Sequence, residues 1–216
     1  MRLVTTATAW IAAATAVAGL ATLATRSGWV GASRLAASPK AIEEGNVWLL
    51  ATSALVADRP WLPSLLGFAI AGLVAVSLAP GRIVVLAALT GHILATLVVY
   101  GILGIVRAVD PDALARLVRA PDVGLSAIIA AWIGVVAAVA WRRYGSRRAR
   151  ILDVAGCIGC ALIGFAFRPD VTLLDLEHIV AFALGVAIAA WWPEEHGGPS
   201  DFDGELERLL AARARR

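Results

Sequence analysis

The chain has 216 residues, of which 60% are hydrophobic and 16% charged, and its formal net charge is +3. Its mean hydropathy of +0.79 lies well above that of soluble domains, which excludes a soluble globular protein. Arginine-rich loops between apolar segments account for the positive charge, so the charge gives no reason to expect a nucleic-acid partner.

Six apolar segments are long enough to cross about 30 Å of hydrocarbon as helices. Short clusters of charged residues separate them, and none shows the alternation of a membrane β-barrel strand. The predicted fold class is therefore all-α, with six transmembrane helices in one polytopic bundle embedded in the lipid bilayer. The predicted spans cover 3–24, 62–79, 83–106, 124–141, 151–167 and 174–192.

The first span, 3–24, is Ala-rich and ends in small residues, as a secretory signal does. Its apolar length exceeds that of a signal peptide and favours a retained helix. The segment 25–61 that follows is the one large connection between spans. Its apolar part, WLLATSAL, is too short to cross the bilayer, and Trp48 and Trp61 flank it as interfacial anchors do. We expect a short helix that lies along the membrane surface.

The basic loops predict how the bundle is oriented. The loop 141–150 holds five arginines and no acid, and the chain ends in ARARR. Both belong on the cytoplasmic side by the positive-inside rule, so both termini are expected in the cytoplasm. The connections 25–61, 107–123 and 168–173 then face outward. The Ala- and Arg-rich composition is typical of a GC-rich bacterium, and we expect a multi-pass protein of the bacterial plasma membrane.

Three acidic residues stand at helix starts. Asp122 precedes the fourth span, where its carboxylate is expected to accept hydrogen bonds from the free amides of the first turn. Asp175 and Glu177 are expected to do the same at the sixth span. Glu177 is next to His178, but adjacent residues on a helix point apart.

A histidine, His92, lies within the third span. That span runs from the inside to the outside, so His92 is expected near the bilayer centre, where ionisable residues are candidates for function. We interpret it as a polar contact between helices. A small transporter or channel would need further charges near the midplane or helices broken by Pro or Gly.

Ser126 and His178 each lie within about one turn of the outer ends of spans four and six, and so at the same expected depth. Below each residue runs a stripe of small residues, which lets helix backbones approach closely. The stripes are Ala130, Gly134 and Ala138 on one span, and Ala181, Gly185 and Ala189 on the other. If the stripes pack together, the imidazole is able to activate the hydroxyl as a nucleophile. The alternative is a serine bonded to a carbonyl one turn back and a histidine satisfied as a polar residue.

The two cysteines, Cys157 and Cys160, form a CIGC motif within the fifth predicted span. One such pair supplies at most half of a zinc site, and apolar surroundings are normal for buried cysteine. We therefore expect no metal and no cofactor.

The tail 193–216 is polar and Gly-rich, and then amphipathic. Phe202, Leu206, Leu209 and Leu210 share one helix face at spacings of three and four. This predicts a short cytoplasmic helix resting on anionic lipid, with a disordered tail as the alternative.

Several of these segments resemble the rhomboid intramembrane proteases. GLSA at 124–127 resembles their GxSG motif, and HIVAFALG at 178–185 resembles their HxxGxxxG pattern, with Ala181 replacing the first glycine. The similarity extends over about 46 to 192 and implies a water-filled cavity open to the outer face. It implies a serine protease that cleaves transmembrane segments of membrane proteins, with Ser126 as nucleophile and His178 as base. Gly124, Leu125 and Ala127 would support the oxyanion.

The chain also departs from that family. Rhomboid proteases carry an HxxxN motif at the start of the second helix, where this chain reads RPWLPSLLGF, and Ala127 replaces the second glycine of GxSG. DVGLS and GHILAT resemble a divergent actinobacterial rhomboid-like group instead. Loss of an oxyanion donor typically lowers turnover by about 10² to 10³. Two hypotheses follow, an active protease and an inactive pseudoprotease that binds transmembrane helices without cutting them.

Overall fold

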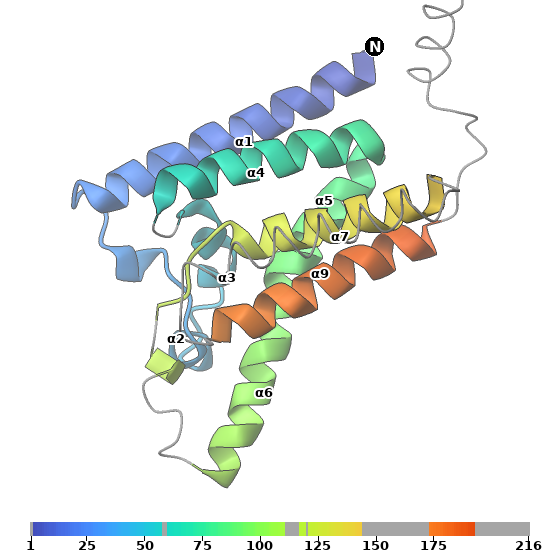
Figure 1. The fold of residues 1–216 in the computed structure, drawn as a ribbon. Coiled ribbons are helices and arrows are strands. Elements are labelled where there is room, and N and C mark those ends of the chain that lie inside the picture. The colour runs from blue at the N-terminus through green and yellow to red at the C-terminus, as the bar shows by residue number, and fades with distance from the viewer. Residues whose placement is uncertain (1, 58–59, 111–116, 120, 144–172, 193–216) are drawn as a thin grey trace, which may run out of the picture.

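The computed structural model describes residues 2–57, 60–110, 117–119, 121–143 and 173–192 (Figure 1). Within these ranges the chain is helical and contains no strand, only an isolated bridge between Ala37 and Asp122. The predicted span at 151–167, with its CIGC motif, and the predicted tail helix lie outside the described residues. The elements are α1 (Arg2–Arg26), η1 (Ala32–Arg34), α2 (Pro39–Glu43), α3 (Leu49–Thr52), η2 (Ser53–Leu55), α4 (Trp61–Leu78), α5 (Gly81–Leu89), η3 (Thr90–Leu94), α6 (Ala95–Val109), η4 (Leu117–Arg119), α7 (Ser126–Arg143) and α9 (Leu173–Trp191).

Three described helical stretches are long and apolar enough to cross a membrane, namely Thr8–Arg26, Trp61–Leu78 and Gly81–Val109. Two shorter apolar helical stretches are Ser126–Arg142 and Leu176–Trp191. Many large apolar side chains on these helices point outward, as lipid contact would require and water would not favour. The fold is that of a helical protein suited to a membrane.

The helices form two side-by-side pairs joined by a long crossing helix (Figure 1). One pair is α1 with α4 and the other is α7 with α9, and α7 also packs on α4 and α5. The segments α5, η3 and α6 follow one another without a break and pass across the α7–α9 pair. The far end of α6 extends past the other helices (Figure 1).

Trp132 of α7 lies where three of these helices meet. Its ring centroid is 4.8 Å from that of Phe68 on α4, and its Nε1 donates a hydrogen bond of 2.9 Å to the carbonyl of Val84 on α5. Gly72 leaves room for the indole, since a Cβ there would lie 2.9 Å from it. A single indole therefore ties α4, α5 and α7 together through one polar and several apolar contacts.

The segment 49–55, where a short helix along the membrane surface was expected, packs against the bundle. It forms two consecutive short turns, α3 and η2, in which Leu49, Leu50 and Ser53 are buried. The turns contact η3 and α1, and the amide of Ala57 donates to the hydroxyl of Thr22 at 2.8 Å. The turns pack against the bundle because the side chains on their inner face, Leu49 and Leu50, are apolar.

Candidate functional site

The helices α7 and α9 touch through their backbones. A Cβ added to Gly185 would lie 2.0 Å from the carbonyl oxygen of Ala131, and one added to Gly134 would lie 2.3 Å from that of Phe182. Ala181 is fully buried, and Ala130 packs against the core. Only small residues fit this interface, because each clash is with backbone atoms, which cannot move aside as a flexible side chain can.

The register of this contact determines what lies opposite Ser126. The two helices run in the same direction (Figure 1), with Ala131 against Gly185 and Gly134 against Phe182 and Val186. Counting back along both helices places Ser126 level with the segment 174–180, which contains His178. The serine and the histidine are therefore at one level on adjacent helices.

Ser126 is the first residue of α7 and is half-buried. Thr22, Ser77 and Thr90 each donate to a carbonyl in the preceding turn of their own helix. Ser126 has no helical turn before it, and its hydroxyl makes no hydrogen bond to any residue in the described part of the chain. The hydroxyl is thus not held by the back-bonding that is usual for serine in membrane helices.

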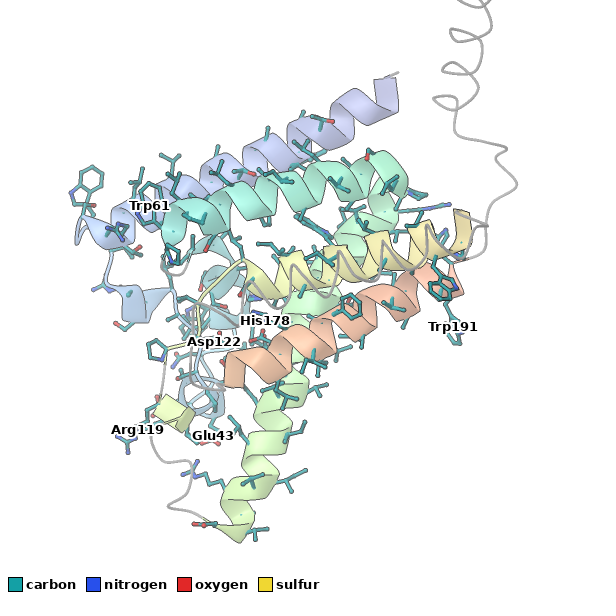
Figure 2. All side chains as sticks on the ribbon, viewed as in Figure 1. Glu43, Trp61, Arg119, Asp122, His178 and Trp191 are labelled. Atoms are coloured by element: carbon teal, nitrogen blue, oxygen red, sulfur yellow. The ribbon has the colours of Figure 1, made fainter. Side chains whose placement is uncertain are left out.

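His178 lies at the start of α9 on the side facing α7, as Figure 2 shows, and is half-buried. Its Nε2 atom is buried, and among the described residues no hydrogen bond joins it to the hydroxyl of Ser126. The two side chains share a level without being bonded. In free enzymes such pairs are often longer than in the complex with substrate.

The residues around Ser126 are tightly held. Gly124 has φ 144°, a backbone conformation that favours glycine, and its amide donates to the carbonyl of Ser53 at 3.2 Å. Leu125 and Ala127 are buried in the core. With the Gly124 amide engaged, the donors left for an oxyanion are the first-turn amides of α7, which have no carbonyl one turn earlier.

His92 is closer to this region than its sequence position suggested. It lies in the π-helix η3 and is buried, and its Nε2 is hydrogen-bonded to the hydroxyl of Ser53 at 3.1 Å. Its neighbour Gly91 packs on α7, where an added Cβ would lie 2.3 Å from Cβ of Ala131 and 3.4 Å from the carbonyl oxygen of Ala127. His92 therefore binds the turn η2, near the start of α7.

The expected capping role of Asp122 was wrong. Among the described residues no amide of the first turn of α7 donates to its carboxylate, which accepts a hydrogen bond of 3.0 Å from the hydroxyl of Tyr100 on α6. Its backbone pairs with Ala37 through two hydrogen bonds of 2.7 and 2.9 Å. Burial raises the pKa of the Asp122 carboxyl above its usual range.

The expected capping role of Glu177 was also wrong. Its side chain is buried, hydrogen-bonded to Thr96 of α6, and within hydrogen-bonding range of the Asp122 carboxyl. Its neighbour Asp175 has no described side chain. An acid within an apolar segment requires a specific partner, and the capping interpretation did not use this signal.

The partners of the two acids carry a signal that the sequence reasoning missed. His92, Thr96 and Tyr100 follow at intervals of four residues, which places them along one face of an otherwise apolar helix. The hydroxyl of Thr96 also donates to the carbonyl of His92 at 2.5 Å. A polar stripe of this kind predicts a partner stripe, and the structure supplies Ser53, Glu177 and Asp122.

Among the described residues no three His, Cys, Asp or Glu side chains come together as a metal site would require. Comparisons with models of protein families, with curated proteins and with solved structures found no match.

Proposed function

We propose that the chain is a rhomboid-like intramembrane serine protease that cleaves transmembrane segments of membrane proteins. Ser126 is the nucleophile and His178 is the base. The observation that supports this most is the backbone contact of α7 with α9, because its register brings the two residues to one level. The GLSA and HIVAFALG motifs around them add the resemblance to rhomboid proteases.

In this mechanism Nε2 of His178 accepts the proton of the Ser126 hydroxyl as its oxygen attacks a peptide carbonyl of the substrate. The imidazolium then gives that proton to the leaving amine, and an acyl-enzyme remains. Water, activated by the same histidine, hydrolyses the ester and restores the serine. The amides of the first turn of α7 stabilise the oxyanion, since they point toward the nucleophile's end of the helix. This chemistry uses no metal and no cofactor.

A second candidate function is that of a pseudoprotease that binds transmembrane helices without cutting them. Two observations favour it: among the described residues Ser126 is not bonded to Nε2 of His178, and Ser53 occupies the amide of Gly124. The missing HxxxN motif also favours a pseudoprotease. Both candidates place the site in a helical bundle in the bacterial plasma membrane, with lipid and membrane-protein helices as partners.

The test is labelling of purified, detergent-solubilised protein with a fluorophosphonate probe, together with cleavage assays on model transmembrane substrates. We expect labelling that disappears in Ser126→Ala and falls by about 10³-fold or more in His178→Ala. Ser77→Ala is the matched control, since Ser77 is an exposed helical serine that bonds only to its own helix. Absence of Ser126-dependent labelling, with helix binding retained in crosslinking, would establish the pseudoprotease.

The orientation is tested separately. The proposed topology, with multiple membrane passes and both termini in the cytoplasm, predicts that a cysteine placed at position 34 is labelled from outside intact cells. One placed at position 146 would be labelled only after the membrane is permeabilised. The opposite pattern would invert the assignment.

A further inference from the structure

The two segments that carry Ser126 and His178 are also joined by a pair of acids. Asp122 lies four residues before Ser126, and Glu177 directly precedes His178. Their carboxyl groups are within hydrogen-bonding range of each other. Figure 2 shows Asp122 beside the start of α9. The contact therefore joins the segment before α7 to the first turns of α9. It lies on the N-terminal side of the backbone contact at Gly185.

The bridge needs a proton. Two carboxylate oxygens cannot approach to hydrogen-bonding range without one, because both are acceptors. Among the described residues, the groups that face the pair are hydroxyls, Tyr100 bonding Asp122 and Thr96 bonding Glu177, both from α6. No lysine or arginine faces either acid there, and His92 of η3 contributes only its carbonyl, which is bonded to Thr96. Within the described part of the chain, a proton shared by the two carboxyl groups is therefore what balances their charge.

We propose that Asp122 and Glu177 are positioning residues, whose shared proton fixes the distance between Ser126 and His178. This inference rests on the proposed function of that serine and histidine. Neither acid touches the substrate. They act by tying the chain on either side of the reacting pair to α6, so that losing the proton moves the first turn of α9 away from the start of α7.

The sign of the pH effect follows from the burial of the pair. Burial raises the pKa of Asp122 in the folded protein. A carboxyl of this kind stabilises the fold fully below its ordinary pKa of about 4, and the stabilisation is lost as pH rises through the folded-state pKa. At alkaline pH both carboxyls are charged and repel each other. Stability and reactivity should both fall there.

The experiment measures the rate of fluorophosphonate labelling and the thermal midpoint of the full-length protein in detergent across a pH series. The variants are Glu177→Gln, Asp122→Asn and Glu177→Leu. Glu44→Gln is the control, because Glu44 is an exposed acid paired with Lys40 at 3.5 Å. Gln keeps the shape of Glu and an N–H donor without a titrating proton, whereas Leu keeps the volume and removes the bridge.

The wild-type labelling rate should fall at alkaline pH. In Glu177→Gln that fall should disappear, in labelling and in thermal midpoint alike, and Asp122→Asn should behave in the same way. Glu177→Leu should stay folded but label about 10- to 100-fold more slowly at every pH. A purely structural acid would leave the Leu variant fully reactive.

Two results would overturn the inference while leaving the proposed function in place. One is an alkaline fall in Glu177→Gln equal to that of the wild type, and the other is a Glu177→Leu variant that labels at the wild-type rate. A wild-type protein that is unlabelled at every pH would instead refute the proposed function, and the positioning role with it. The thermal midpoints would then still report whether the pair shares a proton.

Discussion

Two contacts hold α7 and α9 together, one along the middle of the helices and one near their starts, and they differ in kind. The lower one is an apolar seam, in which Gly134 and Gly185 let the two backbones touch. The upper one is a polar network, in which Ser53, His92, Thr96, Glu177 and Asp122 are linked by hydrogen bonds across α6. The seam sets the register of the two helices, and we propose that the network sets how far apart their first turns stand. Breaking the first should unfold the pair, and breaking the second should leave it folded but loosened.

The largest effect is expected from Gly185→Leu, because its Cβ would lie 2.0 Å from a backbone oxygen of α7. The two helices would have to separate, and the free energy of unfolding should fall by about 3 kcal/mol or more. Denaturant titration in mixed micelles measures the loss. Gly104→Leu on α6 is the control, since an added Cβ there meets nothing within 4 Å. Equal losses in the two variants would show that α7 and α9 do not depend on this seam.

A smaller effect is expected from the upper network. Ser53→Ala leaves the Nε2 atom of buried His92 without its partner, which should cost about 1 to 3 kcal/mol of unfolding free energy. His92→Leu should cost a similar amount. The double variant should cost less than the two single losses added together, because the hydrogen bond can be lost only once. Simple additivity in this double-mutant cycle would mean that the two side chains do not interact.

The smallest effect is expected where the outer segment meets α6 at the surface. Arg107 and Glu43 form an ion pair of 3.3 Å, and both side chains are about half exposed. Water and salt screen such a pair, so Arg107→Ala should change the free energy of unfolding by about 0.5 kcal/mol or less. The same titration measures it at low and high salt. A loss above that of Ser53→Ala would place the main attachment of the outer segment at its surface and not at His92.

The seam could be predicted from sequence, whereas only one side of the network could, namely the stripe of His92, Thr96 and Tyr100. Gly134 and Gly185 belong to stripes of small residues that a four-residue spacing reveals, and the apolar lengths of the spans locate the helices that contain them. The network joins residues far apart along the chain, such as Ser53 with His92 and Thr96 with Glu177. Such pairs depend on how each helix is rotated about its axis, and hydropathy does not report rotation.

Local rules failed for Asp122 and Glu177 for the same reason. Each acid stands near the start of a predicted span, where the helix dipole and free amides normally attract it. In the structure Tyr100 and Thr96 bind them instead, because α6 passes beside the segment before α7 and beside the first turns of α9. A buried hydroxyl partner is preferred to the helix amides, because water can bind those amides equally well.

The π-helix at Thr90–Leu94 sets that rotation of α6. Such a turn carries one residue more than an α-helical turn, and it therefore turns everything after it by about 100°. A chain shortened by one residue within TGHIL would regain regular winding and swing Thr96 and Tyr100 away from the acids that they bind. The inserted residue therefore determines which face of the described helix Gly81–Val109 meets the two acids, which lie on separate segments.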